Sequence, residues 1–172
     1  HRKPPRARLR QLVGGRIVRL RRHGKYLLID IEHPSRTLLV HLGMTGRLLI
    51  APRGAPRAKH THVELSLGDR ELRFVDARRF GQIDVFEPAD AATHEALAGL
   101  GPDPLVHGVD AAALHERARG KQTTLKAFVL DQRVLAGIGN IYASEALWRA
   151  ELRPTRRTRT LTRAQAVRLA DA

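Results

Sequence analysis

The chain has 172 residues, 42% of them hydrophobic, and its 31 Lys and Arg against 17 Asp and Glu give a net charge of +14. The length allows one domain or two small ones, no apolar run is long enough to cross a membrane, and the lack of cysteine excludes a disulfide framework, a thiolate zinc site and thiol catalysis within these residues. Such a basic composition predicts a polyanionic partner, above all a nucleic acid. No apolar stretch follows the basic start, so no signal peptide is expected and the cytoplasm is the expected location.

The first half of the chain has the pattern of short strands separated by turns. Leu27, Ile29 and Ile31 alternate with more polar positions, so they are expected to share one face of a strand. The expected strands are residues 16–20, 25–32, 37–42, 47–51, 62–67, 71–75 and 82–86, with an exposed loop at 52–59. Many short strands at close spacing predict an antiparallel sandwich or barrel.

The pattern changes near residue 88, where alanine becomes frequent and the apolar period lengthens. Helices are expected over residues 90–97, 110–119 capped by Asp110, 123–132 capped by Thr123, 141–150 capped by Asn140, and from Thr162 onward. Thr162 and Gln165 have the spacing of a capping box. Residues 100–105, with two prolines, are expected to be a turn that connects two parts. We therefore predict an α+β fold with a β-sandwich domain at 1–90 and a helical domain at 91–172.

The segment RVLAGIGNIYASEAL (133–147) places two glycines just before an expected helix. Gly137 and Gly139 allow positive φ on either side of Ile138, and backbone N–H groups at the start of the helix could bind a phosphate. The spacing matches neither a Walker loop nor the dinucleotide-binding pattern. An ordinary pair of helices joined by a turn remains the alternative.

Two further turn segments carry side chains that could probe a duplex. HLGMTG (41–46) places Met44 between two glycines, and DARRFG (76–81) places Arg78 and Phe80 before a glycine. An apolar or aromatic side chain held out on a tight turn can enter a base stack or a gap left by a flipped base. The alternatives are a buried Met44, and a core Phe80 beside a surface pair of Asp76 with an arginine.

The titratable residues alone do not define a catalytic centre. His60 and His62 would lie on one face of a strand, but no carboxylate matches their spacing, so contacts to DNA are preferred over a metal site. Lys25 could transfer protons if burial beside other cations lowered its pKa. The residues by themselves indicate a basic DNA-binding α+β protein.

Taken together and in order, several segments resemble bacterial formamidopyrimidine-DNA glycosylases: GKYLLI (24–29), HLGMTGRL (41–48), KHTHVEL (59–65), FVDARRFG (74–81), LGPDPL (100–105), KQTTLK (121–126) and LAGIGNIYASEAL (135–147). The resemblance implies a β-sandwich domain and a helical domain with a helix–two-turn–helix motif. It also implies a base-excision DNA repair enzyme that removes oxidised purines, such as 8-oxoguanine and formamidopyrimidines, and cleaves the abasic site as a lyase. The implied partner is double-stranded DNA containing an oxidised base or an abasic site, bound by a monomer with no membrane involved.

The resemblance also assigns roles to individual residues. Lys25 corresponds to a lysine that binds phosphate and transfers a proton during strand cleavage. The implied DNA-contacting residues are His41, His60, Arg78, Lys121 and Asn140, of which Asn140 holds a phosphate. The residues implied to fill the gap left by the flipped base are Met44, Arg78 and Phe80.

The chain departs from the family at both ends. Family members begin, after removal of methionine, with Pro-Glu-Leu-Pro-Glu, whose proline amine is the nucleophile, and they end in a zinc finger. This chain begins at His1 and has no cysteine, and Pro4 and Pro5 have peptide-bonded nitrogens that cannot form an iminium. The chain is therefore expected to be an internal fragment without the nucleophile or a metal, with the one zinc ion in the missing finger. As printed it is expected to be inactive, and to form no borohydride-trappable adduct at the rate of a full-length relative.

Three other functions remain open. Endonuclease VIII relatives, which act on oxidised pyrimidines, share the fold and several motifs. A non-catalytic DNA-binding module could keep the fold without the chemistry. A helix–turn–helix regulator fits the arginine-rich helices but not the strand-rich first half.

Overall fold

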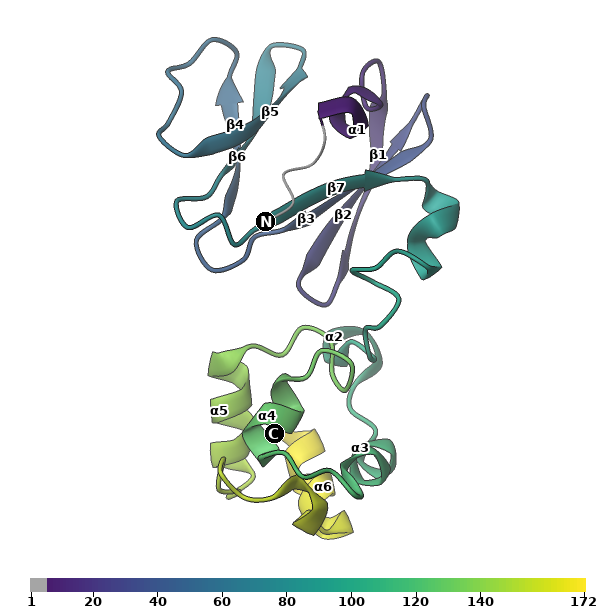
Figure 1. The fold of residues 1–172 in the computed structure, drawn as a ribbon, viewed down its shortest axis with the longest axis vertical. Coiled ribbons are helices and arrows are strands. Elements are labelled where there is room, and N and C mark those ends of the chain that lie inside the picture. Colours follow the sequence, from purple (N-terminus) through teal and green to yellow (C-terminus); the bar gives the residue numbers. More distant parts are fainter. Residues whose placement is uncertain (1–5) are drawn as a thin grey trace. The chain divides into compact units, whose positions relative to one another are not determined.

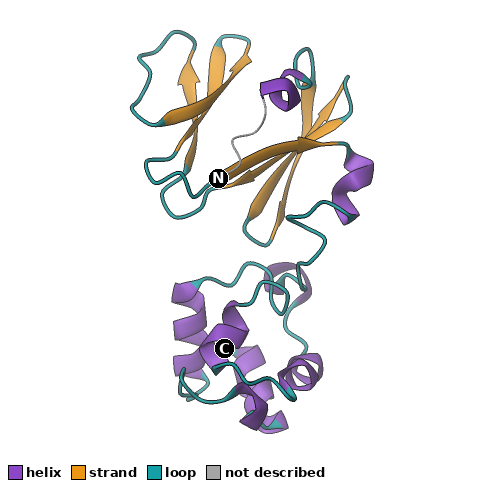
Figure 2. Cartoon of the chain, viewed as in Figure 1, coloured by secondary structure: helices purple, strands orange, loops and turns teal. Residues whose placement is uncertain are grey.

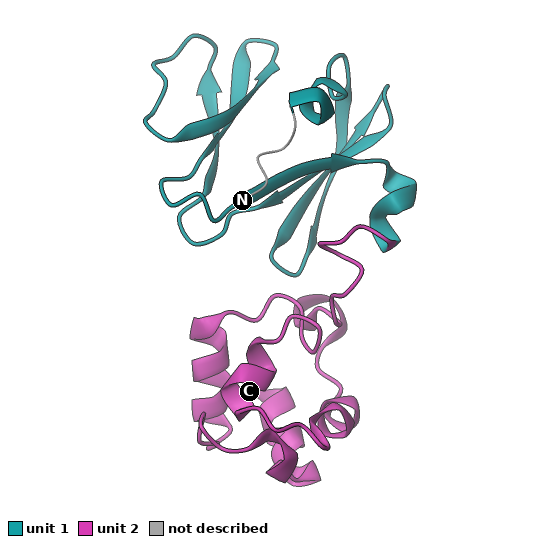
Figure 3. Ribbon diagram, viewed as in Figure 1, with its two compact units in different colours: residues 1–92 teal, residues 93–172 magenta. Residues whose placement is uncertain are grey.

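The computed structural model describes residues 6–172, and the chain divides into two compact units, residues 1–92 and 93–172 (Figure 3). The first unit contains the strands and the second is helical (Figure 2). This arrangement confirms the predicted α+β fold. None of the helices between residues 6 and 172 combines the length and the apolar composition that crossing a bilayer requires.

The first unit consists of two antiparallel sheets (Figure 1). The four-stranded sheet has the order β1 (Arg16–His23), β2 (Tyr26–Glu32), β3 (Arg36–His41), β7 (Gln82–Phe86). The three-stranded sheet has the order β4 (Arg47–Pro52), β6 (Arg70–Val75), β5 (Thr61–Leu67). A short helix, α1 (Arg6–Arg10), precedes the strands, and a 3₁₀ turn, η1 (Pro88–Ala92), follows them.

The core of the first unit lies between the two sheets. The four-stranded sheet contributes Ile29, Ile31, Leu38, Val40, Ile83 and Val85, and the three-stranded sheet contributes Val63, Leu72 and Phe74. The predicted alternation in β2 is confirmed, because Ile29 and Ile31 are in this core and Leu27 packs against it. Leu28, on the opposite face of β2, is also only 3% exposed, so both faces of this strand are covered.

The second unit packs its helices around a separate apolar core. Its elements are α2 (Pro104–His107), α3 (Ala111–Ala118), α4 (Leu125–Leu130), α5 (Asn140–Arg149), the 3₁₀ turn η2 (Thr158–Thr160) and α6 (Arg163–Asp171). The most completely buried members of this core are Leu125, Ala143, Leu147 and Ala166.

The helix starts confirm two predicted caps. The Asp110 carboxylate accepts hydrogen bonds from the backbone N–H groups of Ala112 and Ala113, and Thr162 forms the full capping box with Gln165. Both arrangements satisfy N–H groups that the first turn of a helix leaves without partners.

Three other predicted elements need correction. No helix forms over residues 90–97, where only η1 is present, because this alanine-rich segment buries none of its residues and helix propensity alone rarely stabilises a short helix. Thr124, not Thr123, caps α4, since Thr123 instead hydrogen bonds to Thr158. The predicted turn at 100–105 contains the start of α2, which Asp103 caps.

Candidate nucleic-acid interface

A buried carboxylate joins two loops at one end of the first unit. Asp76 is 0% exposed. Its carboxylate accepts hydrogen bonds from Thr45 Oγ1 at 2.5 Å, from the Arg78 N–H at 3.2 Å and from the Gly81 N–H at 2.8 Å. Thr45 lies in the β3–β4 loop (residues 42–46), whereas Arg78 and Gly81 lie in the β6–β7 loop (residues 76–81). One side chain therefore fixes both loops.

The hydrogen bonds also decide the charge of Asp76. Burial is the largest single influence and opposes ionisation, but the hydrogen bonds from Thr45, Gly81, Arg78 and Arg79 together outweigh it, so the pKa of Asp76 is lowered. Asp76 is therefore ionised at neutral pH and acts as an acceptor for all its donors.

The same two loops meet at glycines. Gly43 has φ of +64°, and a Cβ there would lie 2.7 Å from the Gly81 backbone nitrogen. A Cβ on Gly81 would in turn lie 2.9 Å from the His41 carbonyl oxygen. Only glycine allows the loops to approach this closely, so they are held together at one rim of the unit.

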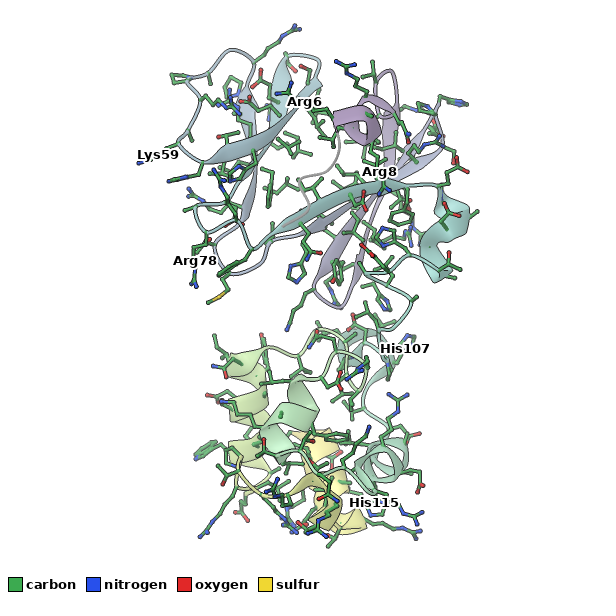
Figure 4. The ribbon with its side chains drawn as sticks, in the orientation of Figure 1. Arg6, Arg8, Lys59, Arg78, His107 and His115 are labelled. Atoms are coloured by element: carbon green, nitrogen blue, oxygen red, sulfur yellow. The ribbon has the colours of Figure 1, made fainter. Side chains whose placement is uncertain are left out.

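The side chains carried by this rim are exposed. Met44 is 72% exposed and Phe80 is 44% exposed. The Arg78 guanidinium stacks over the Phe80 ring, 4.7 Å from its centroid, and Figure 4 shows Arg78 pointing away from the ribbon. The alternative of a core Phe80 beside a surface Asp76 is therefore wrong, because Phe80 is exposed and Asp76 is the buried residue of the two.

Lys25 and His41 lie next to this rim. Lys25 is in the turn between β1 and β2, and His41, at the end of β3, packs against Tyr26 with ring centroids 4.9 Å apart and accepts a hydrogen bond from the Gly43 N–H at Nδ1. Burial lowers the pKa of the Lys25 amine, and burial followed by the nearby Lys25 charge lowers the pKa of His41. His41 is therefore neutral at pH 7.

His60 is linked to Asp76 through its backbone. Its carbonyl oxygen accepts the Asp76 N–H at 3.0 Å, and the His62 Nε2–H donates to the Asp76 carbonyl at 2.7 Å. His60 has φ of +67° and precedes β5, so the expectation that both histidines share one strand face is wrong. Among residues 6–172, no three His, Asp or Glu side chains gather in a way that could hold a metal ion.

In the second unit, Gln132 holds the loop before α5. Its amide oxygen accepts the Gly137 N–H at 3.0 Å and its amide nitrogen donates to the Ile138 carbonyl at 2.9 Å. Gly137 has φ of +99° but Gly139 has φ of −105°, so positive φ was correctly predicted for only one of the two glycines.

Helix α5 begins without a side-chain cap. Gly139 is its N-cap and forms no side-chain cap, so the prediction that Asn140 caps the helix is wrong. Asn140 is instead the first helical residue, and it is exposed. Backbone N–H groups in the first turn therefore lack a side-chain cap, which is the arrangement that binds anions.

Lys121 lies between α3 and α4 and is exposed. Its carbonyl oxygen accepts the Arg159 N–H at 3.2 Å. Within residues 6–172, the Lys121 ammonium forms no ion pair, although its charge helps to lower the pKa of the Asp131 carboxyl, after the larger effect of Arg133. An exposed ammonium without a direct ion pair can bind a phosphate.

Comparison with known families identifies both units. Residues 1–83 match the model described as the formamidopyrimidine-DNA glycosylase N-terminal domain, and residues 100–172 match the model described as the formamidopyrimidine-DNA glycosylase H2TH domain. The chain belongs to the formamidopyrimidine-DNA glycosylase family. The two matches leave only residues 84–99 outside them, a segment that includes η1.

Individual glycosylases of the family show the same relationship. The formamidopyrimidine-DNA glycosylase of Methylococcus capsulatus is 48% identical over 146 residues, which cover 84% of this chain and 53% of that protein. That of Carboxydothermus hydrogenoformans is 44% identical over 163 residues, covering 95% of this chain and 58% of that protein. The chain thus spans little more than half the length of these curated relatives.

Solved structures agree with the fold. A Lactococcus lactis Fpg in complex with DNA containing an abasic site has a TM-score of 0.87 and 31% identity, over 94% of this chain and 59% of that one. A second Lactococcus lactis formamidopyrimidine-DNA glycosylase structure, non-covalently bound to abasic-site DNA, has a TM-score of 0.90 and covers 98% of this chain and 65% of that one.

The structure groups the candidate residues of this glycosylase-family chain by unit. The first unit brings together Lys25, His41, Met44, His60, Arg78 and Phe80 around the loops that Asp76 joins, and the second unit carries Lys121 and Asn140. Sequence reasoning missed Asp76 as the anchor and Gln132 as the residue that shapes the α5 loop. The available signal was their position, since Asp76 directly follows β6 and Gln132 lies two residues after α4, and each precedes a glycine-containing loop.

Proposed function

We propose that this chain recognises damaged DNA as part of a base-excision repair glycosylase that removes oxidised purines, such as 8-oxoguanine and formamidopyrimidines, and cleaves the abasic site as a lyase. The observation that carries the proposal is the rim of the first unit, where one buried carboxylate holds out Met44, Arg78 and Phe80. The family and the names of its members support this activity, and the similar Lactococcus lactis structures contain damaged DNA.

The chemistry of the rim suits a duplex from which a base has been removed. Exposing an apolar side chain to water is unfavourable, and burying it in the base stack in place of a missing base is favourable. The Arg78 guanidinium adds a planar cation that can stack on a base and bind a phosphate. Met44 and Phe80 would therefore occupy the gap while the damaged nucleotide is extruded.

The second unit would bind the DNA backbone. The uncapped first turn of α5 and the Asn140 side chain offer N–H donors to one phosphate, and the Lys121 ammonium offers a charge to another. His41 and His60 would make further backbone contacts from the first unit. The protein would act as a monomer on DNA in the bacterial cytoplasm.

Lys25 would assist strand cleavage. Burial lowers the pKa of its amine, which brings the group closer to neutral pH and makes proton transfer easier than from a fully hydrated lysine. Bound beside a phosphate, this amine would donate a proton to the leaving phosphate oxygen.

A binding comparison tests the proposal. The 172-residue chain is titrated against one duplex with a central tetrahydrofuran abasic-site analogue and against the same duplex without damage. We expect tighter binding to the abasic duplex, because only that duplex has a gap for Met44 and Phe80. Equal affinity for both duplexes would contradict the assignment of the rim to lesion recognition, and would favour the non-catalytic DNA-binding module.

We expect Asn140→Ala and Lys121→Ala each to weaken binding to damaged and undamaged duplexes about equally, by about 1–2 kcal/mol, because each removes a hydrogen bond to a charged phosphate. Fluorescence anisotropy with both duplexes measures the effect. Arg70→Ala is the control, since it removes one exposed charge at the β5–β6 turn, at the opposite end of those strands from Asp76. A change in lesion preference at constant overall affinity would show that these residues do not contact phosphates.

A further inference from the structure

The segment that follows α5 is fastened along the segment that carries Lys121. Six hydrogen bonds to backbone carbonyl oxygens join the two segments, and Thr158 is buried between them at 0% exposed. The bonds are Lys126 N to Pro154 O, Leu125 N to Arg156 O, Thr158 N and Oγ1 to Thr123 O, Arg157 Nη1 to Gln122 O, and Arg159 N to Lys121 O. The backbone of Arg159 is thus fixed directly beside that of Lys121.

This segment is strongly basic and has no acidic residue. Six arginines and no carboxylate lie between Glu151 and Asp171. Arg159 is exposed, and within the described residues 6–172 it has no ion pair. Two other exposed arginines of the same unit are neutralised locally, because Arg119 pairs with Glu116 and Arg133 with Asp131.

Building on the proposed function, we propose that Arg159 and Lys121 form one phosphate-binding pair. Arg157 lies beside them, held by the hydrogen bond from its guanidinium to the Gln122 carbonyl oxygen. Because the two backbones are hydrogen bonded to each other, no backbone freedom has to be lost to bring the two cations together on one anion, and only their side chains become ordered. The Arg159 guanidinium can also bind phosphate oxygens bidentately, which a lysine cannot do. The helical unit would then contact the DNA backbone at two places, the start of α5 and this pair.

The salt dependence of binding tests the pair. Arg159→Gln keeps the backbone N–H that donates to the Lys121 carbonyl oxygen, so we expect the fold to be retained. Thermal melting of the variant verifies this. Arg119→Gln is the matched control, since it also removes one exposed positive charge two residues before Lys121, but from an arginine that is already paired with Glu116. The dissociation constants of both variants and the unaltered chain are measured for the undamaged and abasic duplexes across a series of NaCl concentrations.

We expect Arg159→Gln to make the plot of log K against log salt less steep by about 0.9, which is the change for one lost phosphate contact on duplex DNA. Binding to the undamaged and the abasic duplex should weaken equally. Arg119→Gln should leave the slope unchanged. Equal slopes for the two variants, with normal binding by the unaltered chain, would overturn the phosphate pair and leave the proposed function intact. Absence of DNA binding by the unaltered chain would overturn both.

Discussion

Replacing Asp76 by asparagine is expected to lower the free energy of unfolding of the strand unit by about 1–3 kcal/mol, and to abolish its preference for abasic DNA. The carboxylate accepts from Thr45, Arg78 and Gly81, and an amide presents one acceptor fewer and adds two donors. At least one buried donor then loses its partner, at a cost of about 1–3 kcal/mol. The two loops are no longer held together, so their exposed side chains cannot enter the duplex as a unit.

Thermal unfolding across a pH series measures this prediction. The pKa of Asp76 is lowered in the folded protein, so its stabilisation is fully present above the unfolded pKa of about 3.9 and is lost as pH falls through the folded pKa. The difference between Asp76→Asn and the unaltered chain should therefore be constant near neutral pH and shrink below about pH 4. Asp69→Asn, at the exposed β5–β6 turn, is the control. A variant as stable as this control would show that Asp76 does not hold the loops.

Met44→Ala and Phe80→Ala are expected to weaken binding to abasic DNA by about 1–3 kcal/mol each, the usual loss for a side chain that stacks with bases. Their stabilities should change by only about 0.5 kcal/mol, because both side chains are exposed. Buried residues of this size would cost about 2–5 kcal/mol of stability instead. Undamaged duplex, which has no gap to fill, should be affected less.

Binding to both duplexes and thermal melting, measured on each variant, separate the two interpretations. Leu105→Ala is the control, because Leu105 is another large apolar residue, 85% exposed, in the helical unit. A large fall in melting temperature with unchanged discrimination between the duplexes would show that Met44 and Phe80 stabilise the fold and do not recognise the lesion. Arg78→Gln should behave like them, since it removes the cation stacked on Phe80.

Much of the strand unit was predictable because apolar residues recur within its strands and glycines occupy most of the turns between them. The alternation around Ile29 and Ile31 places these residues in the core, and the Thr162 to Gln165 spacing yields the capping box found in the structure. Both signals are local. The helix predicted at 90–97 failed because alanine content indicated helix where no partner surface buries it.

The candidate site was only partly predictable, for a physical reason. Asp76 and Thr45 are 31 residues apart, so no local pattern shows that one carboxylate joins two loops. Likewise, the choice of Thr124 over Thr123 as a cap depends on Thr158, which holds Thr123 from 35 residues away. The motifs predicted candidate DNA-contacting side chains, and the tertiary hydrogen bonds explain how these side chains are held.

The separate cores of the two units have a consequence for how the protein unfolds. The strand unit buries residues between Ile29 and Val85, whereas the helical unit buries residues between Leu114 and Leu169. Each core can therefore melt as its own cooperative transition, so calorimetry should give a van't Hoff enthalpy smaller than the calorimetric enthalpy. A duplex that binds both units would raise both melting temperatures by mass action and draw the two transitions together.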